Sequence, residues 1–169
     1  KTRWIKDNLG LAVPPWSCDH TWCAPVIGEE AYAWMSPIVY SRECSLAAEP
    51  VPGAPEALEK LAAYGPVYIV TARDSSYSSF AEEWLKKHGL MRHITRIVPW
   101  TGGPKISTTR ALGCCALVDD DIRHMLVEPA PDLALLLIKP GYDGDHDIPA
   151  GVTLCDSWDR VVEKAVRGL

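Results

Sequence analysis

The sequence predicts an α/β protein in which a parallel sheet carries helices on both faces. Two observations support this. First, the sequence contains short apolar runs that are typical of buried strands. Second, these runs alternate with stretches whose apolar residues recur at helical spacing, which is the pattern of parallel α/β sheets. A proline-dense linker at 49–55 separates a helical region, 1–50, from a larger α/β core, 51–169. A chain of 169 residues has room for one well-buried domain with a small insertion.

The first fifty residues predict a small helical cap. Residues 1–10 are expected to form a short helix, whereas three prolines make 11–26 an irregular connection. A second helical pattern covers 29–46 and is interrupted by Pro37. We expect the aromatic side chains of this region to lie mainly in its core, and stacking on a flat ligand is the alternative.

The core reads as strands separated by amphipathic helices that end at Gly or Pro. Strands are predicted at 67–70, 94–98, 116–118, 133–138 and 152–155. Helices are predicted at 55–64, 76–88, 106–112 and 122–128, followed by a final helix that Asp156 or Ser157 caps.

Composition narrows the classes of partner. A formal net charge of -5 argues against binding to a nucleic-acid duplex. No apolar run approaches the roughly 18 residues of a membrane span, so we expect a soluble, cytoplasmic protein.

The six cysteines do not follow a disulfide framework, and free thiols are expected. Cys18, His20 and Cys23 lie close together, but a zinc site would need a fourth ligand.

Three predicted strands are followed by polar residues suited to phosphate chemistry. Thr71 follows the strand at 67–70, Lys105 begins the helix after the next strand, and three aspartates at 119–121 follow the strand at 116–118. Each has a simpler explanation, because Thr71 could cap a helix, Lys105 could be solvated and the aspartates could be a capping cluster. Together they offer a hydroxyl, an ammonium and carboxylates at one sheet edge.

In this order, these segments resemble motifs of the haloacid dehalogenase-like phosphohydrolase superfamily, in particular its deoxyribonucleotidase-like group. The sequence VYIVTAR at 67–73 is similar to the second motif, whose Thr binds the phosphoryl group. GGPK, ending at Lys105, is similar to the third motif, and LVDDD at 117–121 is similar to the fourth. The resemblance covers about 52–169 and implies a parallel, three-layer Rossmann-like core with a helical cap.

The resemblance also implies roles for individual residues. Thr71 and Lys105 would be catalytic and would bind the phosphate of the substrate, with Ala72 and Arg73 as further substrate contacts; Arg73 could equally be a surface ion-pair partner. Asp120 would bind Mg²⁺ directly, and Asp119 would support it in the metal site.

The first motif of the family, Asp-x-Asp-x-Thr, is absent from the sequence. Asp19 does not replace it, because no buried strand precedes Asp19 and the second aspartate is missing. We expect a strand upstream of Lys1 to carry this motif and to lie between the strands at 67–70 and 116–118. The alternative is that 1–26 supplies an unusual substitute in a domain that is not a working phosphatase. Direct pairing of those two strands would contradict the missing strand.

The predicted function is therefore Mg²⁺-dependent hydrolysis of a phosphomonoester through an aspartyl-phosphate, as in a nucleotidase. A nucleoside monophosphate is the expected substrate, because of the family and because of aromatic residues in the cap. Those residues are Trp16, Trp22, Tyr32, Trp34 and Tyr40. Another small phosphorylated metabolite, or a non-catalytic binding or regulatory role, is the alternative. Homodimer formation is compatible with the sequence.

Overall fold

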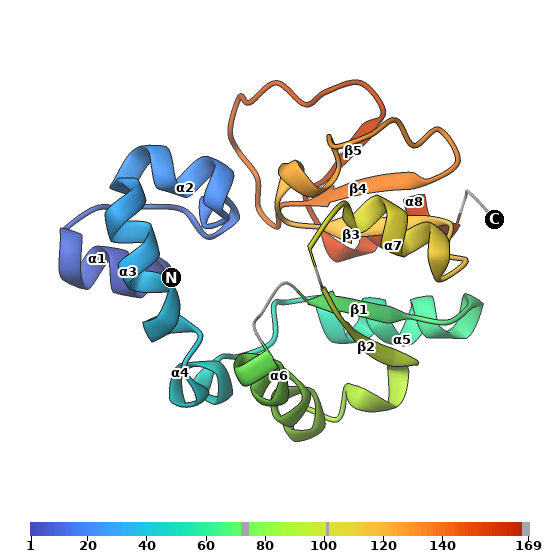
Figure 1. Ribbon diagram of the computed structural model, residues 1–169, viewed down its shortest axis with the longest axis horizontal. Coiled ribbons are helices and arrows are strands. Elements are labelled where there is room, and N and C mark those ends of the chain that lie inside the picture. Colours follow the sequence, from blue (N-terminus) through green and yellow to red (C-terminus); the bar gives the residue numbers. More distant parts are fainter. Residues whose placement is uncertain (72–74, 101, 167–169) are drawn as a thin grey trace.

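The computed structural model describes residues 1–71, 75–100 and 102–166. These ranges form a mixed α/β fold with five short strands and eight α-helices. Figure 1 shows the cap helices α1 to α3 on one side of the molecule and the strands with their helices on the other. The fold class predicted from the sequence is thus confirmed at the level of parallel strands combined with helices.

The cap consists of four helices and one short 3-10 turn. They are α1 (Thr2–Leu9), the turn η1 (Pro15–Ser17), α2 (His20–Ile27), α3 (Glu29–Val39) and α4 (Arg42–Ala47). Gly10 ends α1 in the left-handed conformation, which glycine adopts at little cost. Buried Ile5, Val13, Cys23 and Met35 form a core for this region that is separate from the cores around the strands.

Two predictions for the cap were wrong. The stretch predicted to be irregular contains α2, because the Asp19 side chain accepts a hydrogen bond from the Trp22 amide and starts a helix there. Pro25 lies inside that helix, whose buried face offsets the lost backbone bond. The predicted helix at 29–46 is two helices that meet at Ser41, whose side chain caps α4, and Pro37 is accommodated within α3.

The five strands form two separate parallel sheets. In the first, β1 (Tyr68–Thr71) pairs with β2 (Arg96–Pro99). In the second, β4 (Ala134–Ile138) lies between β3 (Ala116–Asp119) and β5 (Val152–Cys155). Each strand lies within two residues of its predicted position, since a continuous apolar run marks a buried strand clearly.

The core helices follow the prediction except at one place. They are α5 (Ala54–Tyr64), α6 (Ser75–Lys87), α7 (Lys105–Ala111) and α8 (Trp158–Val166), with a 3-10 turn η2 (Met91–His93) before β2. The helix predicted at 122–128 is only a 3-10 turn, η3 (Ile122–His124). Its extension is limited by the prolines that follow at 129 and 131.

Helix α5 connects the two sheets. Its Leu58 packs against the apolar cluster that contains Ile69 of β1 and Leu85 of α6. One turn later, Leu61 packs against the cluster formed by β3, β4 and α8. Lys60 of α5 also pairs with Asp159 of α8 at 2.9 Å. One helix layer therefore underlies both sheets (Figure 1).

Strands β1 and β3 are not paired with each other in the described part of the chain. Direct pairing of these two strands would have contradicted the expected missing strand, and the described residues show no such pairing. The described strands also do not form one continuous Rossmann-like sheet. Likewise, no helix within the described ranges is long and apolar enough to cross a bilayer.

Candidate functional site

The predicted polar residues lie at or directly after the ends of strands. Thr71 ends β1 and Asp119 ends β3, while Lys105 opens α7 after β2. Lys1 lines the same cavity as Thr71, and its positive charge acts to lower the pKa of the Asp120 carboxyl. Open α/β sheets bind ligands at the carboxyl ends of their strands, which is where Thr71 and Asp119 lie.

Lys105 and Asp119 form a buried ion pair. The Lys105 Nζ donates to Asp119 Oδ2 at 2.6 Å, and both residues are more than nine-tenths buried. The second carboxylate oxygen of Asp119 accepts a hydrogen bond from the Asp121 amide at 2.9 Å. Two strong contacts thus fix the Asp119 side chain and hold the Lys105 ammonium at the end of β3.

Asp121 is occupied by contacts of its own. Its carboxylate caps η3 by accepting from the Arg123 amide, and it also accepts from the Thr21 hydroxyl of the cap at 2.8 Å. The guanidinium of Arg123 donates to the same carboxylate at 2.6 Å. Burial raises the pKa of Asp121, but these hydrogen bonds outweigh it and lower that pKa to about 2. Asp121 therefore joins the cap to the core as an ionised group.

Asp120 is the free carboxylate of the three. Its side chain reaches solvent, and no hydrogen bond or ion pair links it to another described residue. Surrounding protein removes part of its hydration, and this desolvation, together with the negative charge of Asp119, raises the pKa of Asp120. A carboxylate that has no direct ion-pair partner and faces water is a suitable ligand for a hard cation.

Thr71 faces a cavity of about 420 Å³ between the cap and β1. Its backbone carbonyl accepts a hydrogen bond from the Trp100 amide, which fixes the end of the strand. The cavity is mostly apolar, with walls from α4, α6 and β1, and the Tyr40 side chain is part of its lining. Ala72 and Arg73, the other predicted substrate contacts, lie outside the described residues.

The aromatic residues of the cap do not form one ligand-stacking surface. Trp34 is 62% exposed and packs edge-on against Trp4. The prediction that its side chain lies in the core was therefore wrong. Trp16 and Trp22 contact the loop after β4, and Tyr32 accepts a hydrogen bond from Lys1. Of the five predicted residues, Tyr40 alone is among the cavity-lining residues.

An ion pair that the sequence analysis did not identify connects the cap to the core. Lys139, directly after β4, donates to Asp19 Oδ2 at 2.5 Å, and both side chains are almost completely buried. The Lys139 ammonium also lies 3.8 Å from the centre of the Trp22 ring. A lysine that directly follows a buried apolar strand was the available signal, but its partner is 120 positions away.

The described residues contain no group of three His, Cys, Asp or Glu side chains arranged to hold a metal ion. Cys18 instead contacts the Thr2 hydroxyl, and His20 pairs with Glu29 at 2.9 Å. Mg²⁺ often needs only one or two protein carboxylates and completes its shell with water and phosphate oxygens. Asp120, with Asp119 beside it, fits that smaller requirement.

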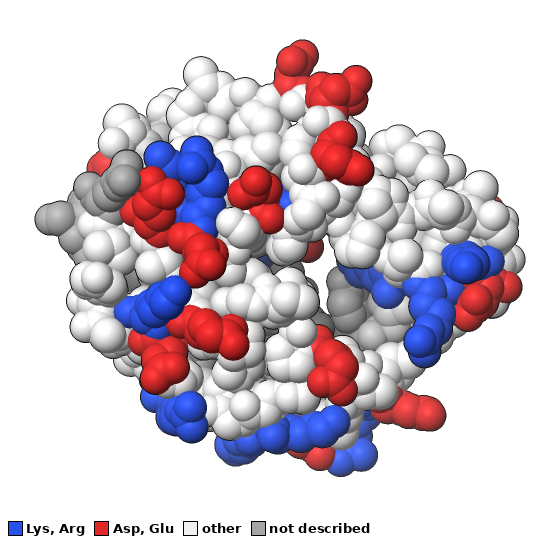
Figure 2. All heavy atoms as spheres, turned by 180° about the vertical axis from the view of Figure 1, so that it is seen from behind, with Lys and Arg blue, Asp and Glu red and all other residues white. Residues whose placement is uncertain are grey.

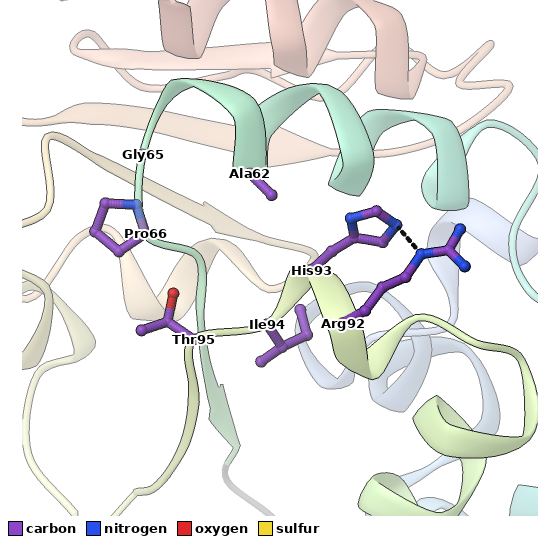
Figure 3. A pocket seen from close by; sticks show the side chains of 7 residues that line it. All are labelled: Ala62, Gly65, Pro66, Arg92, His93, Ile94 and Thr95. Atoms are coloured by element: carbon purple, nitrogen blue, oxygen red, sulfur yellow. Dashed lines mark hydrogen bonds between the residues drawn. The ribbon is translucent and has the colours of Figure 1, made fainter.

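A second pocket lies at the opposite, amino-terminal edge of β1 and β2. Figure 3 shows it between the end of α5 and η2, with the Arg92 Nε donating to His93 Nε2. Its volume is about 260 Å³. Pro66 and Thr95, which line it, precede the two strands, so the pocket is separate from the acidic cluster.

Comparisons with protein-family models, with curated proteins and with solved structures found no match for this chain.

Proposed function

We propose that this chain carries the phosphate-binding and cation-binding groups of a Mg²⁺-dependent phosphomonoester hydrolase. The supporting observation is the buried pair of Lys105 and Asp119 beside the unpartnered, solvent-facing carboxylate of Asp120. An ammonium offsets phosphate charge, and a free carboxylate is the protein ligand that Mg²⁺ prefers. Such a combination at the carboxyl edge of parallel strands suits phosphoryl transfer.

The residues of the chain have distinct tasks in this proposal. Lys105, fixed by Asp119, directs positive charge toward the oxygens of the phosphoryl group, and the Thr71 hydroxyl donates to one of them. Asp120 holds the cation, and Asp119 sets the position of Lys105. Bound Mg²⁺ would neutralise charge that builds up on the phosphoryl oxygens.

The nucleophile in this proposal is an aspartate from a segment ahead of Lys1. One of its carboxylate oxygens attacks phosphorus, and the ester bond breaks as the alcohol leaves with a proton. Water then attacks the aspartyl-phosphate, which releases inorganic phosphate and restores the carboxylate. The cavity beside Thr71 would hold the organic part of the substrate, a nucleoside being our first choice.

The test is a hydrolysis assay with the product of the complete reading frame. Nucleoside monophosphates, sugar phosphates and p-nitrophenyl phosphate are compared with Mg²⁺ and with EDTA. Asp120→Asn should lower activity at limiting Mg²⁺, because it replaces the carboxylate that would bind the cation with a neutral amide. Asp145→Asn, on an exposed loop, is the matched control.

The substrate panel separates the alternatives. Hydrolysis that is restricted to sugar or other small metabolite phosphates would keep the proposed chemistry but change the substrate. If the complete product hydrolyses no phosphomonoester with Mg²⁺ present, the enzyme proposal is wrong and a binding or regulatory role replaces it.

A further inference from the structure

The pocket between the end of α5 and the turn η2 has the size of a site for a small molecule. Its volume is about 260 Å³, which is below the roughly 300–1,000 Å³ of pockets that hold drug-sized ligands. Figure 2 shows acidic and basic side chains interspersed on one face of the molecule, a mixture that favours no macromolecule of either charge there. The pocket therefore suits a small ligand, and the polar groups that line it define the chemistry of that ligand.

One wall of the pocket presents hydrogen-bond donors. The Arg92 Nε donates to His93 Nε2 at 3.0 Å, so this ring nitrogen is an acceptor and the hydrogen of the neutral imidazole is on Nδ1. Figure 3 shows the second ring nitrogen on the pocket side of the imidazole and the Arg92 guanidinium on its other side. The Thr95 hydroxyl accepts from the Val67 amide at 3.2 Å and keeps its own hydrogen to donate. His93 and Thr95 can therefore both donate to one ligand.

Arg92 adds positive charge behind this wall. Its side chain is exposed, and none of the carboxylates within the described ranges forms an ion pair with it. The guanidinium also strengthens the Nδ1–H of His93 as a donor, because hydrogen bonds in a chain polarise one another. Two donors backed by a positive charge match the two oxygens of a carboxylate.

The opposite wall presents acceptors, because it contains the carboxyl end of α5. The last carbonyls of a helix lack partners within the helix. The Leu61 carbonyl accepts from the Gly65 amide at 3.2 Å, but no described group donates to the carbonyls of residues 62–64. The next residue, Pro66, has no N–H to offer them. These carbonyls and the negative end of the helix dipole favour a cation that can donate hydrogen bonds.

The two walls together select a ligand that carries both charges. An anion alone would meet the negative end of the α5 dipole. A cation alone would leave the donors of His93 and Thr95 without an acceptor. A molecule with a carboxylate and an ammonium close together satisfies both walls. The side chains of Ala62 and Ile94, which also line the pocket, provide a small apolar surface between them.

We propose that this pocket binds a small α-amino acid. The carboxylate of the ligand accepts hydrogen bonds from His93 and Thr95, and its ammonium lies against the free carbonyls at the end of α5. A side chain of one or two heavy atoms packs on Ala62 and Ile94. Thr71 lies at the opposite end of β1, so the site does not depend on the proposed hydrolysis.

Titration of the chain of 169 residues, followed by amide NMR spectra, tests the site because it detects weak binding and locates it. Glycine, alanine and serine should shift the amide resonances of Gly65 and of residues 93–95. N-acetylalanine lacks the ammonium and alaninamide lacks the carboxylate, so each should bind at least about tenfold more weakly than alanine. Tryptophan is too large for the pocket and should leave these resonances unchanged.

Two pairs of variants assign the contacts. His93→Phe removes the ring donor and should weaken alanine binding at least about tenfold. His93→Asn, whose side-chain amide can donate from the position of Nδ1, should retain most of the binding. Thr95→Val should weaken binding in the same way, whereas Thr95→Ser keeps the hydroxyl and should bind alanine normally. Circular dichroism establishes that each variant is folded.

Three results would overturn the proposal. The resonances could stay unshifted at millimolar alanine, or acetate and phosphate could shift them as strongly as alanine, which would make the pocket a site for anions only. His93→Phe could also bind alanine with unchanged affinity, which would place the ligand elsewhere. No hydrolysis is measured, so this test and the phosphatase assay can fail independently.

Discussion

Breaking the buried ion pair between cap and core should strongly destabilise the protein. In Lys139→Met, the carboxylate of Asp19 stays buried without its cation, since the two side chains are only 1% and 2% exposed. Removing one partner of such a pair typically costs about 3–5 kcal/mol. That loss is a large fraction of the roughly 5–15 kcal/mol by which folded domains are stable.

Urea unfolding followed by circular dichroism measures this loss. The double variant Lys139→Met with Asp19→Asn should recover most of the stability, because it removes both charges while the amide side chain can still cap α2. Lys60→Met is the surface control, because Lys60 and its partner Asp159 are 53% and 86% exposed and such pairs contribute about 0–1 kcal/mol. If Lys139→Met cost no more than this control, the assignment of a buried structural pair would be refuted.

Three further predictions concern other contacts. Asp121, with its pKa near 2, should add stability above about pH 4 that is lost as pH falls toward 2. Arg123→Met should weaken this dependence in unfolding curves between pH 2 and 7, and an unchanged curve would contradict it. Asp120→Asn should raise the free energy of unfolding at pH 7, because the raised pKa of Asp120 marks an unfavourable charge, and this gain should vanish below about pH 4. A loss of stability at pH 7 would contradict this account. Gly144→Ala should lower the free energy of unfolding by about 1–3 kcal/mol, because the added Cβ would lie 3.0 Å from the Trp16 ring. Gly65→Ala, with open space around its Cβ, should cost less, and thermal unfolding of both variants measures the difference.

The sequence alone determined the strands and most of the core helices. An apolar run such as 133–138 predicts a buried strand without knowledge of its neighbours, because a continuous run fits a parallel sheet covered on both faces. The amphipathic pattern and the closing Gly–Pro of α5 likewise predict that helix from local signals. The sequence also predicted which polar residues follow the strands, and the structure places Lys105 directly on Asp119.

Tertiary structure decided what no local pattern contains. Pro25 and Pro37 suggested interruptions, yet packing of the cap keeps both within helices. The ion pair of Asp19 and Lys139 joins positions 120 apart, so only the folded chain could reveal it. The lack of pairing between β1 and β3 in the described part of the chain likewise depends on which strands meet in space, because hydrogen bonds of a sheet link residues that are distant in sequence.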